Sequence, residues 1–537
     1  MDTEVLIIGA GPTGLMLANQ LGRRGIPTLI IDRHSGPAQQ TRAMAVQART
    51  LEIYAKLGIV PRALALGRRA NGANMWAQGR PMARIPLGDI GQHVSPFPFV
   101  LLLGQDDNER ILGEHLRHWH MAVQWHTELL ALDQSADYVT AKLKQADGTT
   151  REITAAYVAG CDGGHSAVRE LSHIDFPGAP YEQVFFVADT EASGAMVPDE
   201  LNVYLWRDGF HLFFPIHGQD RWRVIGVLPK QFREREDLRF EDLSADISRE
   251  VGGNLTFKQC PWFSTYCIHH RVAEKFRERR CFLLGDAAHV HSPMGGQGMN
   301  TGLQDAYNLA WKLALVINGQ ADPQLLDTYA AERLPVARRL LSSTDRAFTL
   351  LVAETWLASL FRTRILARIA AFAMRFAHSR QIAFRALSQT GIAYRHSPLS
   401  KTGPGLPAAA PRAGDRFPWL RLKLRQDGPV QDLYASLDDT CFNLLVLGQP
   451  QVTVAPLAWG PWLRTYVIPR EPVNDHALAR AQLTGPLFYL LRPDGHVGLA
   501  GTHFDASAVS RYLDECRIRR GAQHAGRAGE ATYGRGP

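Results

Sequence analysis

Cysteine is scarce in this chain, and its spacing argues against the sites that cysteine usually builds. Only six of the 537 residues are cysteine, at positions 161, 260, 267, 281, 441 and 516. They form neither a C-x-x-C pair nor a zinc-ligand spacing, so the pattern predicts no disulfide framework and no thiol-disulfide centre. We therefore expect reduced thiols and no metal site.

Long apolar runs and compact clusters of charge are also missing. No run approaches the roughly eighteen apolar residues of a membrane span, and no charged segment precedes the first apolar strand. The net charge is +7, but the arginines are spread through residues 333–395 and the C-terminal tail, unlike a nucleic-acid site. We expect a cytoplasmic protein that neither binds nucleic acid nor inserts stably into a membrane.

One apolar segment, residues 347–387, carries arginines at helical spacing. Such a pattern can lie on a membrane surface, but a helix pair that faces the core or a dimer partner is the favoured interpretation. For the assembly as a whole, a symmetric homodimer is the prior expectation.

Glycine, by contrast, is concentrated in motifs, the first of which is EVLIIGAGPTGLMLANQLGRRGIPTLIIDR. A strand precedes Gly9, Gly11 and Gly14, and a second strand ends in Asp32, with Arg33 beside it. This order predicts a βαβ dinucleotide-binding unit. Gly9 makes the tight turn, Gly11 lets a pyrophosphate approach the backbone and Gly14 allows close helix packing, while Asp32 binds the ribose.

A second glycine-rich stretch, CFLLGDAAHVHSPMGGQGMNTG, spans residues 281–302. An apolar strand delivers Asp286, whose carboxylate can accept a hydrogen bond from a ribityl hydroxyl. Bare backbone N–H groups at the start of the following helix favour an anionic or electron-rich ring. Taken alone this is an ordinary strand-to-helix turn, but with the first motif it predicts a flavin cradle, formed by Gly295, Gly296, Gly298, Met299 and Asn300.

A third motif, YVAGCDGGHSAVRE, brings Asp162 to a turn before a helix that carries Arg169. With GAGPTG first, CDGGHSAVR second and GDAAH third, the chain resembles the flavin-dependent aromatic hydroxylases. These are single-component FAD monooxygenases typified by p-hydroxybenzoate hydroxylase and phenol hydroxylase. The resemblance implies that the first motif binds the ADP half of FAD, the DG motif serves FAD and the reduced nicotinamide, and the GD motif binds the riboflavin half.

Further residues match that family one at a time. Arg42 resembles the family arginine near the FAD pyrophosphate and the nicotinamide, and Arg49 follows it. Gln105 resembles the glutamine that contacts the flavin from a helix start. A later signature, DTYAAERLP, carries Tyr329, Glu332 and Arg333. No second nucleotide-binding βαβ unit is evident, so NAD(P)H is expected to bind transiently near Arg42, with NADPH favoured over NADH.

The motif positions predict an α/β architecture with a Rossmann-like FAD-binding domain. This domain takes residues 1–75, 100–175 and 277–345, and a substrate-binding β-sheet domain takes 76–99 and 176–276. A helical segment spans 346–400, and a Pro-, Ala- and Gly-rich linker spans 401–418. Residues 419–516 resemble the thioredoxin-like C-terminal domain of phenol hydroxylase without a C-x-x-C pair, and 517–537 is expected to be a disordered tail.

The inserted sheet is expected to hold the substrate. Alternation predicts that about half of its side chains are plain sheet packing. Where p-hydroxybenzoate hydroxylase clamps a carboxylate with serine and arginine, this chain has Phe214 and Ile216. A benzoate clamp is therefore not expected, and the substrate is predicted to be a phenol or a larger hydroxylated aromatic, held among Trp206, Phe213, Pro215 and Trp222.

The resemblance implies hydroxylation with NAD(P)H and O2 through a flavin C4a-hydroperoxide. Pro293 matches the family proline that presents a backbone carbonyl to the flavin edge and substrate. A base or proton relay is also needed, and the candidates are His211, His289 and His291. Two alternatives remain open: an FAD-dependent dehydrogenase or reductase on the same fold, and a protein that holds flavin or another ligand without turnover.

Overall fold

The computed structural model describes residues 1–38, 43–207, 209–216, 218, 220–235, 237–292, 294–352, 355–449 and 462–519. Within it the chain separates into two compact units. The first contains residues 1–310, 329–393 and 418–420. The second contains residues 311–328, 394–417 and those from 421 onward. Three expectations, for Arg42, for Pro293 and for the tail beyond residue 519, lie outside the described residues.

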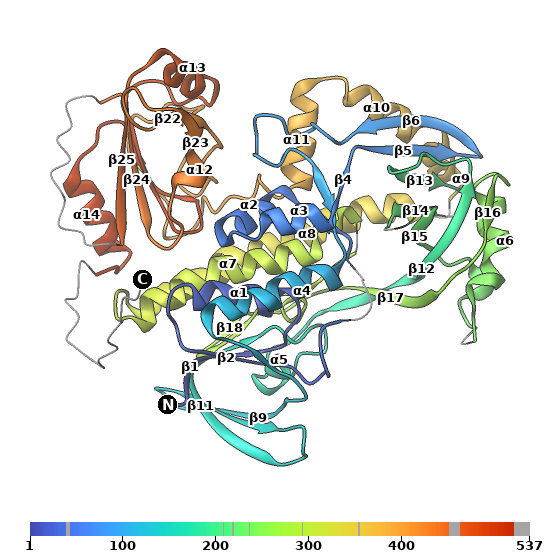
Figure 1. The fold of residues 1–537 in the computed structure, drawn as a ribbon, viewed down its shortest axis with the longest axis horizontal. Helices are drawn as coiled ribbons and strands as arrows, with labels where there is room; N and C mark the ends of the chain where they lie inside the picture. The colour runs from blue at the N-terminus through green and yellow to red at the C-terminus, as the bar shows by residue number, and fades with distance from the viewer. Residues whose placement is uncertain are drawn as a thin grey trace, which may run out of the picture. The chain divides into compact units, whose positions relative to one another are not determined.

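The first unit is built on an eight-stranded sheet that contains the dinucleotide motif (Figure 1). Its centre is parallel: β11 (Thr150–Gly160), β1 (Thr3–Ile8) and β2 (Thr28–Ile31) lie side by side, with β19 (Cys281–Leu283) next to β11. The ends of these strands that pair with one another are apolar, as is typical of the centre of a parallel sheet. The sheet is extended by β8 (Val123–Gln124), β9 (Glu128–Gln134), β10 (Val139–Lys144) and β18 (Arg277–Glu278).

A nine-stranded, mostly antiparallel sheet forms the other half of this unit (Figure 1). Hairpin turns near Gly209 and Gly218 join its consecutive strands, as the sequence predicted. The helix α6 (Phe240–Glu250) packs its apolar side against one face of the sheet. The strands are β5 (Gly72–Ala77), β6 (Arg80–Pro86), β12 (Gly178–Gly194), β13 (Leu201–Leu205), β14 (Phe210–Pro215), β15 (Arg221–Val227), β16 (Leu255–Phe257), β17 (Trp262–Val272) and β20 (His289–Val290).

Helices connect these sheets, and several begin at glycine. The helix α1 (Pro12–Gly22) follows β1 directly, and α4 (Gln105–His115) begins after Gly104 with two acidic residues in its first turn, which favours the helix dipole. Further helices are α2 (Ala48–Leu57), α3 (Val60–Leu66), α5 (Ala167–Leu171), α7 (Gly298–Ile317), α8 (Asp327–Val352), α9 (Trp356–Leu360), α10 (Ala367–Ala373) and α11 (Ala377–Leu387). Among the described residues, no helix is both long and apolar enough to cross a membrane.

The second unit has its own five-stranded sheet, ordered β21-β27-β26-β24-β25, in which the edge strand β21 is Lys401–Thr402. Here β24 (Phe442–Leu447) pairs in parallel with β25 (Leu463–Ile468) and antiparallel with β26 (Leu487–Leu491), which pairs with β27 (Val497–Gly501). The apolar side of α14 (Ala506–Glu515) is buried against this sheet. The thioredoxin-like assignment of this unit stays a prediction.

Candidate functional site

The three glycine-rich motifs meet at one edge of the parallel sheet. In register, Ile8 of β1 stands beside Ile31 of β2 and Gly160 of β11, and Gly160 stands beside Leu283 of β19. The four strands therefore end at the same level. Ligands of open α/β sheets bind beyond this carboxyl edge, so the sequence motifs GAGPTG, CDGG and GDAAH all open onto one candidate site.

The glycines of the first loop do different things. A Cβ at Gly9, where φ is +100°, would lie 2.3 Å from the carbonyl oxygen of Cys161, and one at Gly14 would lie 2.0 Å from the carbonyl oxygen of Gly9. Both glycines are required by close backbone packing. A Cβ at Gly11 would meet no protein atom within 4 Å. Gly11 thus borders open space at the N-terminus of α1, where a pyrophosphate is favoured.

The carboxylate of Asp32 closes this loop from the end of β2. Its Oδ2 accepts a hydrogen bond from the backbone N–H of Ala10 at 2.7 Å, and its Oδ1 accepts one from the N–H of His34 at 2.9 Å. The His34 ring Nδ1 also lies 2.8 Å from Oδ1. A carboxylate has about four acceptor positions, so one position on Asp32 remains for a ribose hydroxyl. The neighbouring Arg33 is exposed.

Arg169 ties the DG motif to the GD motif. Its buried guanidinium donates to the carbonyl oxygen of Ala287 at 3.1 Å and to that of Gly164 at 2.9 Å, and it lies over the ring of Phe176. Asp162 accepts hydrogen bonds within its own turn, from the Ser166 hydroxyl at 2.6 Å and from a backbone N–H, while burial raises its pKa. Asp162 thus organises the turn that carries Arg169.

The GD turn itself packs onto the start of α1. Gly285 has a φ of +59°, and a Cβ there would lie 2.6 Å from the Thr13 hydroxyl oxygen; at Gly302 the distance would be 2.3 Å. Asp286 is exposed, although Gly285 and Ala287 on either side are buried. The riboflavin-side and ADP-side motifs are therefore in direct contact, and the Asp286 carboxylate is presented to solvent beyond the strand end.

His289 belongs to a buried ionic network behind this turn. Its Nε2 lies 2.7 Å from Oδ2 of Asp305, and Arg333 donates to Oδ1 of Asp305 at 2.6 Å. Burial alone would raise the pKa of Asp305, but Arg333 and His289 outweigh it and lower that pKa. Tyr329 donates to the carbonyl oxygen of Leu283 at 2.7 Å. The DTYAAER signature thus fixes the GD strand and turn.

Asn300 holds the glycine segment through its side chain. Its Oδ1 accepts from the backbone N–H of Gln47 at 2.8 Å and from the Thr50 hydroxyl at 2.7 Å, and its Nδ2 donates to the carbonyl oxygen of Ala45 at 2.8 Å. Gln47 in turn donates to the carbonyl oxygen of Gly295 at 3.0 Å. Only the backbone of Asn300 remains for a ligand. Sequence reasoning missed Gln47 and Thr50, because these contacts span about 250 residues.

The start of α4 completes this edge of the site. Gln105 donates to Oε1 of Glu109 at 2.9 Å, and Asn108 Nδ2 lies 3.2 Å from the sulfur of Met299. Burial raises the pKa of Glu109. Arg49, in contrast, is buried in an ion pair with Glu52 at 3.0 Å.

His291 lies beside the glycine cradle. Its Nδ1 donates to the carbonyl oxygen of Ser292 at 2.8 Å, whereas its buried Nε2 has no hydrogen-bond partner among the described residues. A Cβ at Gly298 would lie 3.7 Å from the imidazole ring. Burial lowers the pKa of His291 to about 4, so the ring is neutral at pH 7.

Five residues expected at the substrate sheet are buried, and three of them, His211, Phe213 and Trp222, lie on the face toward α6. His211 is fully buried, with Nε2 2.7 Å from a carboxylate oxygen of Glu250, and it stacks on Trp206. Phe213 and Trp222 are buried in the core that includes α6. Pro215 follows Phe213 by two residues and is also buried.

The opposite face of the same strands is turned toward the glycine motifs. Phe214 packs against the cluster that contains Ala45. Arg223 makes a two-pronged ion pair with Asp189, at 2.7 Å for each hydrogen bond, and its guanidinium lies 3.3 Å from the sulfur of Met44. Because side chains alternate along a strand, Phe213 and Phe214 cannot share a face.

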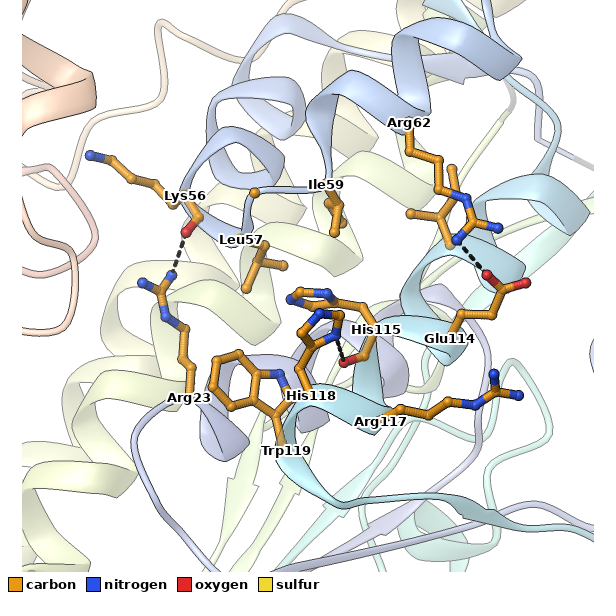
Figure 2. Close-up of a pocket in the computed structure, with 12 residues that line it drawn as sticks. Arg23, Lys56, Leu57, Ile59, Arg62, Glu114, His115, Arg117, His118 and Trp119 are labelled. Atoms are coloured by element: carbon orange, nitrogen blue, oxygen red, sulfur yellow. Dashed lines mark hydrogen bonds and ion pairs between the residues drawn. The ribbon is translucent and has the colours of Figure 1, made fainter. Parts of the chain in front are cut away.

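A separate cavity of about 700 Å³ lies elsewhere in the first unit (Figure 2). It is lined by the ends of α1, α2 and α4, including Arg23, Lys56 and His115, with an ion pair between Arg62 and Glu114. The cofactor motifs stand at the opposite, N-terminal ends of α1 and α4, about 16 Å away for an eleven-residue helix. This cavity is not the candidate site.

The residues at the carboxyl edge fit FAD. Gly11 leaves room for a pyrophosphate, Asp286 is exposed at the end of β19, and the buried Nε2 of His291 faces the glycine segment without a protein partner. Gly11 is in the motif that the resemblance assigns to the ADP half of FAD. Asp286 and His291 are in the stretch that it assigns to the riboflavin half.

Comparison with known proteins agrees with this geometry. A family model described as an FAD binding domain matches residues 2–344. A 6-methylpretetramide 4-monooxygenase of Streptomyces rimosus is 34% identical over 533 residues, covering 96% of this chain and 94% of the relative. The chain belongs to the FAD-dependent aromatic monooxygenases. This monooxygenase thus uses FAD, with NAD(P)H as co-substrate, to hydroxylate an aromatic compound.

Other relatives and solved structures extend the likeness. Pentachlorophenol 4-monooxygenase of Sphingobium chlorophenolicum is 35% identical and covers 64% of each chain. OxyS, an anhydrotetracycline hydroxylase from Streptomyces rimosus, superposes with a TM-score of 0.75 at 29% identity, covering 97% of this chain and all of the other. The fold of the monooxygenase PieE gives a TM-score of 0.78 at 24% identity, covering 96% and 99%. The aromatic hydroxylase fold expected from the sequence is confirmed.

Proposed function

We propose that this monooxygenase hydroxylates a large hydroxylated aromatic, of the fused-ring type, rather than a benzoate. The observation that carries the proposal is the face of β14 and β15 turned toward Ala45. There Phe214 supplies an apolar wall, and the Arg223–Asp189 pair supplies the buried polar group. Two relatives that match nearly the whole chain are named for fused-ring substrates, 6-methylpretetramide and anhydrotetracycline.

Arg223 is the proposed contact for a phenolate or carbonyl oxygen. Its charge is balanced by Asp189, so the buried pair does not require an anionic substrate. A guanidinium has five N–H donors, and Asp189 takes two of them. The substrate oxygen is proposed to approach beside this ion pair, with a rigid aromatic plane packed against Phe214.

The cofactor contacts are proposed residue by residue. Gly9, Gly11 and Gly14 shape the loop at α1 for the pyrophosphate, Asp32 and Arg33 lie toward the adenosine, and Asp286 accepts a ribityl hydroxyl. The backbone from Gly295 to Asn300 and the start of α4 at Gln105 border the ring. Bound FAD would supply the redox chemistry, which is hydride acceptance from NAD(P)H and activation of dioxygen.

Water exclusion and proton transfer fall to the residues around the glycine segment. His291, neutral and with a buried unpartnered Nε2, is the proposed hydrogen-bonding partner there. His289 and His211 are engaged with Asp305 and Glu250, which suits positioning better than substrate deprotonation. For Pro293, Arg42 and Asp162 we propose the roles that the resemblance implies. We also infer that NADPH is the reductant, that the protein is located in the cytoplasm and that it forms a homodimer.

The test is coupled turnover by the FAD-loaded protein. NADPH oxidation, oxygen uptake and hydroxylated product are measured with simple phenols, hydroxybenzoates and fused-ring phenols. The proposal predicts stoichiometric product with fused-ring phenols and uncoupled or absent turnover with hydroxybenzoates. Efficient hydroxybenzoate turnover contradicts the substrate class. Flavin reduction without oxygen incorporation supports the dehydrogenase alternative, and no substrate-dependent NADPH consumption supports the ligand-holding one.

A further inference from the structure

Exposed large apolar side chains collect on one short stretch of the first unit. Of the fourteen such residues in the described chain, eight lie within 27 residues of one another. Of the two interpretations that the sequence favoured, the core-facing one is wrong for these side chains, which are 41% to 72% exposed. The dimer-facing one stays a prediction. They are Trp356, Leu357, Leu360, Ile365, Ile369, Phe372, Phe376 and Ile382.

The same stretch is strongly basic. Residues 355–414 contain no aspartate and no glutamate, whereas six arginines occur between positions 362 and 385. Four of these arginines are exposed, and they are Arg364, Arg368, Arg375 and Arg385. Positive charge without a neighbouring acidic residue in sequence is therefore interleaved with exposed apolar groups.

Apolar and basic residues share one side of the helices α9 and α10 and of the π-helical turn Phe361–Leu366 between them. Arg362, Thr363 and Ala367 on the other side are buried. Exposed positions recur every three or four residues, which is the repeat of a single helix face. We call this side, together with the turn that follows α10, the basic-apolar face, and its members are positions 357, 360, 364, 365, 368, 369, 372, 375 and 376.

The inner side of these helices is firmly attached. Arg362 donates to the carbonyl oxygens of Trp206 at 3.1 Å and Leu351 at 2.7 Å, and also bonds to that of Arg207. Phe384 of α11 is fully buried with Ala45 and Ala48, and α10 lies against β6 (Figure 1). The basic-apolar face is thus the outer surface of a packed element.

Such a face could be covered by a second copy of the chain or by a phospholipid surface, and its charge favours the phospholipid. A second copy, related by a two-fold axis, would bring arginines against arginines with no carboxylate from this segment to balance them. Anionic phospholipid supplies both the negative charge and an apolar layer. Arginine side chains reach from an apolar layer to head groups, and tryptophan favours the boundary.

We propose that the basic-apolar face docks peripherally on an anionic phospholipid surface. The helices then lie in the plane of the interface, with Leu357, Ile369 and Phe372 in the acyl boundary and Arg364 and Arg368 at the phosphates. This inference is independent of the substrate.

Sedimentation of the full-length, FAD-loaded protein with vesicles tests the proposal. Vesicles of phosphatidylcholine alone are compared with vesicles containing roughly 30% phosphatidylglycerol, at low and high salt. We expect binding to the anionic vesicles, reduced by salt. Absence of binding to the anionic vesicles overturns the proposal, as does equal, salt-independent binding to both vesicle types.

Two double variants and two matched controls assign the binding to this face. Arg364→Gln with Arg368→Gln, and separately Ile369→Ser with Phe372→Ser, are expected to lower partitioning roughly tenfold or more. The controls change exposed residues elsewhere: Arg421→Gln with Arg425→Gln, and Val430→Ser with Val473→Ser. FAD content and the light-scattering mass are measured for every variant.

Equal losses in face variants and controls overturn the assignment. A dimer that the face variants convert to monomer, with vesicle binding unchanged, instead identifies this face as the contact between copies and overturns the lipid proposal. Retained FAD content in the face variants shows that their fold is intact.

Discussion

Replacing Gly11 with alanine separates cofactor binding from folding in the first motif. Gly11 has an ordinary φ of −70°, and a Cβ there would meet no protein atom within 4 Å. The free energy of unfolding of the apoprotein should therefore change by less than about 0.5 kcal/mol. The added methyl group would occupy space assigned to the pyrophosphate and hinder its approach to the backbone N–H groups.

The expected loss of FAD affinity follows from those contacts. A hydrogen bond to a charged group contributes about 1.5–3 kcal/mol, so losing one weakens binding about 10- to 100-fold. The dissociation constant is measured by quenching of flavin fluorescence on titration of the apoprotein. The unfolding midpoint in urea is measured on the same preparation.

Gly9→Ala is the matched comparison. Its Cβ would lie 2.3 Å from the Cys161 carbonyl oxygen on a backbone with φ of +100°. Overpacking and backbone strain together should cost about 2–5 kcal/mol of apoprotein stability. Normal FAD binding by Gly11→Ala would contradict the pyrophosphate assignment, as would a loss of apoprotein stability equal to that of Gly9→Ala.

Three further predictions concern side chains around the site. Asp305→Asn should lower the free energy of unfolding by about 3–5 kcal/mol, because Arg333 is left buried without its carboxylate. Since the pKa of Asp305 is lowered in the folded protein, the stability difference from the parent protein should be full above about pH 4 and shrink as pH falls further. Urea unfolding measures this difference, and a difference that stays constant with pH would count against the ion pair. Arg223→Gln should raise KM and uncouple NADPH oxidation from product formation without lowering FAD content. Phe213→Leu, on the opposite face of the sheet, should lower the unfolding midpoint and leave coupling intact. The reverse pattern would contradict the proposed substrate-binding face. His291→Gln should weaken FAD binding but leave the pH profile of turnover from about pH 5.5 to 8 unchanged. The pKa of His291 is about 4, so its ring is neutral throughout that pH range. A shifted profile in the variant would identify His291 as a titrating group.

The sequence predicted the parts of the fold that local patterns encode. The strand before Gly9, the helix after Gly11 and the strand that ends just before Asp32 form the predicted βαβ unit. The three motifs meet because parallel strands end at one edge. Gln105 begins a helix as expected. Each of these features depends on residues close together in the chain or on a general rule of sheet topology.

Tertiary packing determined what the sequence left open. Alternation in β14 showed that Phe213 and Phe214 face opposite ways, but only the position of α6 tells which one is in the core. The side chain of Asn300 is taken up by Gln47 and Thr50, partners about 250 residues distant. Likewise, the exposure of Phe372 depends on which side of α10 meets β6.

Transfer of an oxygen atom from dioxygen to the substrate distinguishes a monooxygenase from a dehydrogenase, and labelled dioxygen detects it. The FAD-loaded enzyme is supplied with NADPH, a fused-ring phenol and ¹⁸O2, and the product is analysed by mass spectrometry. We expect one ¹⁸O atom in the product for each NADPH consumed in coupled turnover. Substrate-stimulated NADPH oxidation that yields an unlabelled product would contradict it.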